Sequence, residues 1–90
     1  MLDRDERRPL RNPNIPWRDD DILGKPGVLI GRYGVNFTGA KIWRLCEGEH
    51  SVDEIVTIIS SEFKTDKKRV EADVIEFLKK LEELKLILWK

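Results

Sequence analysis

One short stretch constrains the fold of this chain more than any other, because its residue pattern changes there from strand-like alternation to helical spacing. Within residues 35–48, the apolar side chains of Ile42, Leu45 and Cys46 recur three and four positions apart, with Trp43 beside them. This spacing places them on one face of a helix. We therefore expect a strand to turn directly into a helix here.

Both ends of that predicted helix carry boundary signals. Thr38 offers a hydroxyl suited to capping a helix N-terminus, and Gly48 suits the left-handed position that ends a helix. Ninety residues are enough for one domain with its own core. The sheet-to-helix junction is thus expected at the centre of a single compact domain.

Composition excludes several classes of partner. Lysine plus arginine equals aspartate plus glutamate at 17 each, so no global field attracts nucleic acid or a membrane surface. The single cysteine forms no internal disulfide, and no apolar run is long enough for a signal-peptide core or a membrane span. These features predict a reducing, cytoplasmic setting.

The N-terminal part of the chain is rich in charged and turn-forming residues. Residues 1–14 are predicted to be a flexible arm, and residues 15–90 the single domain. A short strand is expected over residues 15–18, ended by the three aspartates at 19–21. These aspartates lack the ligand spacing of a calcium-binding loop, so we interpret them as a solvated turn.

A glycine-rich segment, residues 24–37, is interpreted as turn chemistry and not as a phosphate loop, because no helix-opening Gly-Lys-Ser/Thr pattern follows. Pro26-Gly27 fits a type II turn, and Gly31-Arg32 fits a two-residue hairpin loop. Residues 28–30 and 33–37 are then paired antiparallel strands.

Two more helices are predicted. Ser51 and Glu54 form a capping box, and an isoleucine-rich stripe follows them. A third helix begins after Thr65 or Asp66 and runs to about Leu84. Its apolar stripe is Val70, Val74, Phe77, Leu78, Leu81 and Leu84. The apolar residues 86–89 that follow must dock somewhere.

Three pieces of the chain, in this order and at this spacing, resemble the PqqD family of pyrroloquinoline quinone biosynthesis and related peptide-recognition elements, which serve enzymes that modify ribosomally made peptides. The pieces are Asn36-x-Thr38-Gly39-Ala40-x-Ile42-Trp43-x-Leu45-x-x-Gly48, Ser51-Val52-x-Glu54-Ile55-Val56 and Val70-x-x-Asp73-Val74-x-x-Phe77-Leu78-x-x-Leu81. Two residues depart from the family pattern: Glu47 replaces a common aspartate, and Lys85 stands where the third helix usually ends in glycine.

The resemblance implies an α+β, winged-helix-like fold, with a small N-terminal antiparallel sheet of two or three strands followed by a three-helix bundle. It implies no catalysis and no cofactor. The leader of a ribosomally synthesised precursor peptide would bind as an added strand between the third strand and the third helix, for presentation to a radical SAM or other peptide-modifying enzyme. The protein would be a monomer or weak homodimer.

The expected peptide-binding residues lie on that strand and that helix. They are Arg32, Tyr33, Gly34, Val35, Asn36, Phe37, Arg69, Asp73, Val74, Phe77 and Lys80. An edge strand offers unpaired N–H and C=O groups, and Gly34 would admit close backbone approach. Arg69, Asp73, Glu76 and Lys80 could read peptide charge; the alternative is a solvated face with i,i+4 ion pairs.

Two other functions stay open from sequence. One is a DNA-binding winged-helix regulator, although the acidic second helix and the balanced third helix argue against phosphate contacts. The other is a homodimerisation module that pairs its own edge strands or places residues 86–89 in a neighbour's groove. Cys46 and His50 have no second cysteine or histidine to complete a zinc site, so they are expected to be a core residue and a turn residue.

Overall fold

The computed structural model describes residues 5–90, and its elements follow one another in the order sheet, helices, strand. They are β1 (Pro9–Arg11), β2 (Trp17–Ile22), β3 (Lys25–Ile30), β4 (Tyr33–Val35), α1 (Phe37–Arg44), α2 (Val52–Phe63), α3 (Lys67–Glu83) and β5 (Ile87–Trp89).

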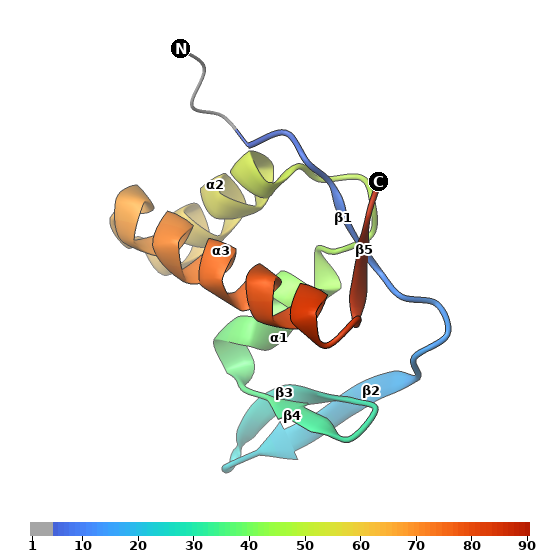
Figure 1. Ribbon diagram of the computed structural model, residues 1–90. Helices are drawn as coiled ribbons and strands as arrows, with labels where there is room; N and C mark the ends of the chain where they lie inside the picture. The colour runs from blue at the N-terminus through green and yellow to red at the C-terminus, as the bar shows by residue number, and fades with distance from the viewer. Residues whose placement is uncertain (1–4) are drawn as a thin grey trace.

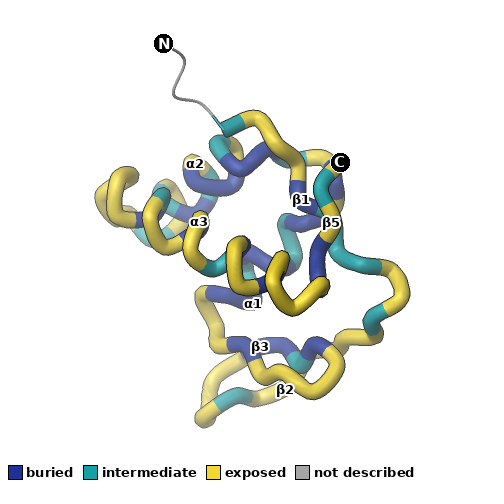
Figure 2. Tube along the Cα trace, viewed as in Figure 1, coloured by how far each residue is buried: buried dark blue, intermediate teal, exposed yellow. Residues whose placement is uncertain are grey.

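The main sheet is antiparallel and has the strand order β2-β3-β4. It lies at one end of the molecule, with α1 packed on β3 and with α2 and α3 beyond α1 (Figure 1). Half of the central strand is buried, whereas its two neighbours are largely exposed (Figure 2). The predicted α+β class, a small sheet followed by three helices, is confirmed.

The predicted centre of the fold is also confirmed. Trp43 on α1 is fully buried and lies edge-on to Trp17 of β2, with the ring centroids 6.0 Å apart. Around it the core draws on β3, β4, the three helices and β5, and its fully buried members include Val28, Ile30, Ile55, Val56, Val74 and Leu78. One indole therefore links the sheet to the helical layer.

The boundaries of α1 differ from the prediction. Asn36, not Thr38, is the N-cap: its side-chain oxygen accepts a hydrogen bond from the Gly39 amide at 2.9 Å. The helix ends at Arg44, before the predicted glycine. Gly48 does have a positive φ of 78°, but it lies in the following loop, where its amide donates to the Pro9 carbonyl at 2.9 Å.

Two predictions about the sheet were wrong. The strand expected over 15–18 runs instead as Trp17–Ile22, through all three aspartates, because each of them pairs with a residue of β3. The turn lies at Leu23 and Gly24, which both have positive φ values of 53° and 82°. Pro26 and Gly27 belong to β3 and not to a type II turn. β4 pairs only with residues 28–30, so no carbonyl of β4 needs the N–H that Pro26 lacks.

The hairpin and the later helices follow the sequence closely. Gly31 and Arg32 form the two-residue loop between β3 and β4, although β4 ends at Val35 and residue 37 already belongs to α1. The capping box at the start of α2 forms in both directions. Asp66 is the N-cap of α3, without a side-chain hydrogen bond.

The backbone after α3 adopts the left-handed conformation that favours glycine, although the residue there is Lys85. Lys85 has a φ of 60°, a left-handed conformation that costs a lysine more than a glycine. The chain then reverses, and Leu86 and Ile87 are buried in the core of the same molecule. This corrects the alternative in which residues 86–89 fill a neighbour's groove.

The main unexpected feature is a closed seam, formed by residues 5–12 with β5 and the loop 46–48. β1 pairs antiparallel with β5, so that Pro9 faces Trp89. On its other side, the Arg11 amide donates to the Cys46 carbonyl at 2.8 Å. Residues 9–11 are therefore not part of a free arm, and residues 1–4 lie outside the described residues.

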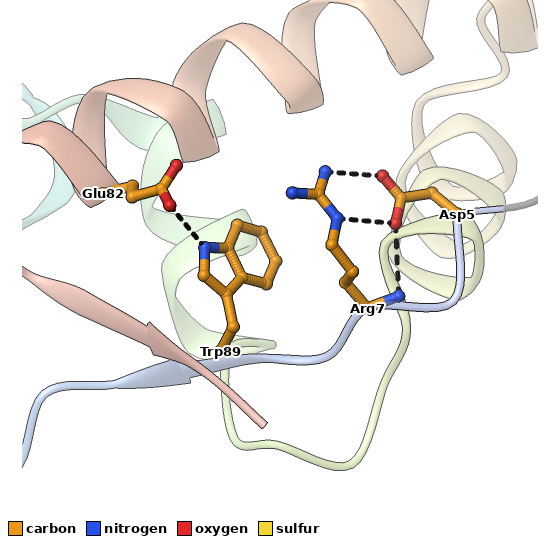
Figure 3. Close-up of polar contacts among 4 residues, drawn as sticks. All are labelled: Asp5, Arg7, Glu82 and Trp89. Atoms are coloured by element: carbon orange, nitrogen blue, oxygen red, sulfur yellow. Dashed lines mark hydrogen bonds and ion pairs between the residues drawn. The ribbon is translucent and has the colours of Figure 1, made fainter.

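The closed seam also completes the start of α2. The amides of Val52 and Asp53, which have no partner inside the helix, donate to the carbonyls of Arg7 and Asp5 at 2.8 and 3.0 Å. The Arg7 guanidinium lies over the Trp89 ring, 4.4 Å from its centroid, while the indole N–H donates to Glu82 of α3 at 3.0 Å (Figure 3). Both ends of the described chain are thus bound to α2 and α3.

Charge reinforces this contact. Arg7 forms an ion pair with Asp5, with Nη2 and Oδ2 2.8 Å apart (Figure 3). The hydrogen bonds from Arg7 lower the pKa of the Asp5 carboxyl, and the same carboxylate raises the pKa of Arg7.

Arg11 anchors the closed seam to the centre of the fold. Its Nη1 donates to the carbonyls of Trp43 and Arg44 at 3.1 and 3.0 Å, which satisfies acceptors at the end of α1. Its guanidinium lies 5.1 Å from the centroid of the Trp17 ring. One arginine from the predicted arm therefore caps α1 and covers a tryptophan of the sheet.

Candidate peptide-binding edge

β4 is an edge strand, and one of its sides has no partner strand among residues 5–90. Ile30 and Tyr33 flank the two-residue loop, so they form a hydrogen-bonded pair, and the pattern alternates along the strand. The N–H and C=O of Gly34 therefore point away from β3. This places one open donor and one open acceptor at the middle of β4.

The absence of a side chain at Gly34 has a different reason from the one expected. A Cβ placed there would lie 3.2 Å from Cδ1 of Ile22, which comes from the far end of β2. Gly27 on β3 is covered more tightly, because a Cβ there would meet the Val35 carbonyl oxygen of β4 as well as Cγ1 of Ile22, the latter at 2.7 Å. The two glycines make room for an isoleucine across the outer face of the sheet.

The predicted strand residues divide by exposure. Arg32, Tyr33, Asn36 and Phe37 are exposed, with 40% of Tyr33 and 37% of Phe37 accessible. Val35 is buried and faces α1. Asn36 is committed to its capping hydrogen bond, so it fixes the end of β4 to the start of α1.

The predicted strand and helix residues meet at Gly39. A Cβ there would lie 2.6 Å from Cγ1 of Val35 and 3.1 Å from the ring of Phe77. Phe77, half-buried on α3, therefore contacts the bare backbone of α1 directly beside the end of β4. Val74, one turn earlier, is fully buried and lies beneath this surface.

The charged row on α3 is exposed and unpaired. Across the part of the chain that the structure describes, Arg69, Asp73, Glu76 and Lys80 form no ion pair or side-chain hydrogen bond. The i,i+4 pairs of the alternative interpretation are thus not formed. These side chains remain available to another molecule.

Sequence reasoning missed one residue of this surface. Leu84 was assigned to the apolar stripe of α3, yet 44% of it is exposed. It follows Phe77 by seven residues, so both lie on the same flank of α3. The sequence signal for it was the width of the apolar stripe of α3, which exceeds the part that the core buries.

A hollow of about 330 Å³ lies beside this surface, between α1, α2 and α3. It is lined by Thr38, Ile42, Ile59, Phe63, Thr65, Val70, Asp73 and Val74. Phe63 of this lining also makes an edge-on contact with Phe37, with ring centroids 6.3 Å apart. Nothing in the sequence identified this hollow, because its walls come from three separate helices.

The remaining candidate groups offer little chemistry. Cys46 is fully buried, and burial raises the pKa of its thiol to about 12, so it stays protonated. His50 lies 4.0 Å from Glu54 at a helix start. Among residues 5–90, no three histidine, cysteine, aspartate or glutamate side chains gather as metal ligands. The helices of this same region are too short or too polar to cross a membrane.

Comparison with known proteins adds independent information. The sequence model of a family described as "Coenzyme PQQ synthesis protein D (PqqD)" matches residues 11–87. No curated protein matches. A structure of TbiB1 in complex with the TbiA(beta) leader peptide is 26% identical, with a TM-score of 0.66 over 87% of this chain and 93% of that one.

A second solved structure shares the fold. It is the solution structure of the PqqD truncation of Methylobacterium extorquens PqqCD, described as a functional, stand-alone RiPP recognition element. It is 20% identical, with a TM-score of 0.67 over 89% of this chain and 87% of that one.

Proposed function

Because the chain belongs to the PqqD family, we propose that it is a peptide-recognition module that binds the leader of a ribosomally synthesised precursor peptide. The leader would add as a strand to the open side of β4, facing the exposed flank of α3. We assign no catalytic residue: the module would hold the precursor while a separate enzyme, of the radical SAM or another peptide-modifying class, acts on it.

The observation that carries this proposal is the outward-facing backbone of Gly34 beside unpaired side chains of α3. An extended peptide can satisfy both backbone groups, while alternate side chains contact the flank that bears Phe77 and Lys80. The solved structure that contains a leader peptide supports leader binding by this fold.

Magnitudes favour moderate affinity. Each added backbone hydrogen bond contributes roughly 0.5–1.5 kcal/mol net, and β4 is only three residues long. Ordering a disordered leader opposes binding. We therefore expect a micromolar dissociation constant, with side-chain contacts on α3 supplying selectivity.

An NMR titration tests the proposal. Isotope-labelled protein would be titrated with the leader of a precursor peptide encoded beside its gene, and with a scrambled peptide of equal composition. We expect shifts over residues 32–37 and 69–80 with the leader alone. Shifts confined to α2 or to the closed seam, with β4 silent, would contradict strand addition.

A further inference from the structure

The hairpin of β2 and β3 projects past β4 and ends in the most exposed large apolar side chain of residues 5–90. β4 pairs only with residues 28–30 of β3, so the part of the hairpin beyond it is residues 20–27, the projecting hairpin. Leu23 at its tip is 98% exposed, whereas Leu88, the next such residue, is 46% exposed. We propose that the projecting hairpin docks on the peptide-modifying enzyme, which holds Leu23 in an apolar pocket and places a lysine or arginine beside it. The inference rests on the proposed function and specifies where the enzyme binds.

The fold gives no reason for a leucine at this tip. Leu23 and Gly24 form a two-residue turn between Ile22 and Lys25, with φ values of 53° and 82°. Positive φ values at both positions indicate a type I′ turn, which favours asparagine, aspartate or glycine at its first position. There the Cβ of leucine crowds the backbone, and its side chain stays in water. Single exposed leucines are common on protein surfaces, but this one is both strained and unpacked, which indicates a contact with another molecule.

The charge beside the tip specifies the surface that it fits. A second hollow, of about 380 Å³, opens between the hairpin and α1 and is lined by Asp19, Asp20, Asp21, Pro26, Gly27 and Arg44. Arg44 forms an ion pair with Asp19, and Arg18 forms one with Asp20. Among residues 5–90, the Asp21 carboxylate forms no ion pair or hydrogen bond. The second hollow therefore keeps a negative charge, which a lysine or arginine of the enzyme would complement.

The sheet fixes the projecting hairpin to the proposed leader-binding edge. β3 belongs to both, because residues 25–27 lie in the projecting hairpin and residues 28–30 pair with β4. A Cβ on Gly27 would meet the Val35 carbonyl oxygen, so the end of β4 packs against the base of the hairpin. Both lie at the end of the molecule away from the closed seam (Figure 1). An enzyme docked on Leu23 would therefore keep a fixed orientation to a leader strand on β4, without covering Gly34.

Charge and position favour the enzyme over the other occupants of this surface. A second copy that met the hairpin with its own would bring Asp21 against Asp21, and like charges oppose such a contact. The backbone groups proposed to bind the leader are those of Gly34 on β4, at the opposite edge of the sheet from β2. The enzyme of the proposed function is the remaining protein that must contact the module while the leader is bound.

An NMR titration with the purified enzyme maps the surface. The probe is the peptide-modifying enzyme encoded beside the gene, added to isotope-labelled protein without a leader. We expect the loss of signal intensity to be largest at residues 20–25, with β4 less affected. Losses that are largest at the closed seam or on α3 would overturn the proposal. Losses at residues 20–25 that appear with rising protein concentration and no enzyme would also overturn it, because they would identify a second copy as the occupant.

Leu23→Asn isolates the apolar anchor. It should weaken enzyme binding at least about 10-fold in an isothermal titration, because a central apolar contact is lost. It should also raise the melting temperature of the free protein, because asparagine suits the first position of the turn. Leu88→Ala, at an exposed leucine of the closed seam, should leave enzyme affinity unchanged. Equal enzyme affinity of the Leu23→Asn and unaltered proteins would overturn the proposal.

Asp21→Asn isolates the charge. It should weaken enzyme binding about 3- to 10-fold at low salt and less at high salt, because salt screens the attraction to a lysine or arginine. Glu49→Gln is the matched control, since it removes an exposed carboxylate in the loop before α2. An equal loss for both variants would show that net charge, and not this hollow, attracts the enzyme.

The outcome is separable from that of strand addition. Leu23→Asn leaves β4 intact, so it should bind the leader as the unaltered protein does. Enzyme binding that depends on Leu23, together with a silent leader titration, would keep the hairpin surface and remove the proposed function. Leader shifts along β4, with enzyme binding that is indifferent to Leu23, would keep the function and remove the hairpin surface.

Discussion

The two sheets of this molecule differ in how they pair a short strand. β1 and β4 are both three residues long, but β1 has backbone partners on both sides, β5 and the loop 46–48, whereas β4 has only β3. They lie toward opposite ends of the molecule (Figure 1). The chain thus fills one strand position with its own N-terminal segment and leaves another open.

The closed seam adds side-chain contacts that the open edge lacks. Arg7, Arg11 and Trp89 connect β1 and β5 to all three helices. At β4, by contrast, the neighbouring side chains on α3 make no pairs within residues 5–90. Substitutions should therefore affect stability at the closed seam and binding at the open edge.

Trp43→Ala should have the largest effect, because this fully buried indole lies where the two regions meet. We expect the free energy of unfolding to fall by roughly 3–5 kcal/mol. Urea unfolding followed by far-UV circular dichroism measures it. An unchanged midpoint would remove Trp43 from the centre of the fold.

Leu88→Pro tests the closed ladder. Leu88 is 46% exposed, so its side chain contributes little to stability. Its backbone, however, pairs with Leu10 of β1, between the hydrogen bonds that join Asn12 to Leu86 and Lys90 to Arg8. We expect a loss of roughly 2–3 kcal/mol from the missing hydrogen bond and the proline ring. Leu88→Ala is the matched control and should lose less than half as much in the same unfolding assay.

Arg11→Ala tests the anchor of the closed seam. Losing two hydrogen bonds to the end of α1 and the contact with Trp17 should reduce stability by about 2 kcal/mol. Arg18→Ala removes an exposed arginine that pairs with Asp20 at 3.5 Å, and it should cost under about 0.5 kcal/mol. Equal thermal shifts for the two variants would show that Arg11 does not anchor the seam.

The Cys46 thiol reports on the closed seam through pH. Burial raises its pKa from 9.0 to about 12, so only the unfolded state ionises between these values. The contribution of the thiol to stability is complete below pH 9 and is lost as the pH rises toward 12. Relative to Cys46→Ala, we expect the free energy of unfolding to fall by about 1 kcal/mol from pH 9 to 10. Parallel pH profiles would show that the thiol reaches solvent in the folded state.

Gly34→Pro should have the smallest effect on stability and the largest on binding. Its N–H points outward, so proline removes no internal hydrogen bond, and the loss should stay near 1 kcal/mol or below. Leader binding in an isothermal titration should disappear. Gly34→Ala makes the same contact with Ile22 but keeps the N–H, so it should still bind the leader. If neither variant binds, the added side chain at residue 34, and not the missing N–H, is the cause.

The sequence predicted those parts of the fold that local chemistry decides. The capping box at Ser51, the long stripe of α3 and the loop at Gly31 each depend on residues within one or two turns of the chain. The central place of Trp43 followed from the change of pattern at the junction of strand and helix. Such signals need no knowledge of the rest of the molecule.

Long-range pairing decided the rest. β1 and β5 are three-residue strands from opposite ends of the chain, and neither has a pattern of its own that indicates the other. Asp19 and its two neighbours became a strand because β3 lay beside them, against their low intrinsic preference. For the candidate site, the strand and helix residues were predictable by periodicity, whereas the hollow needed the packing of three helices.

The facing of Pro9 and Trp89 across one pair of strands has a consequence for modular use of the domain. Both described ends leave the fold from the closed seam, away from β4 (Figure 1). A second polypeptide joined through a linker at either end, or the domain inserted into a loop of another protein, would leave the open edge unobstructed. The closed seam therefore keeps both described ends clear of the open edge.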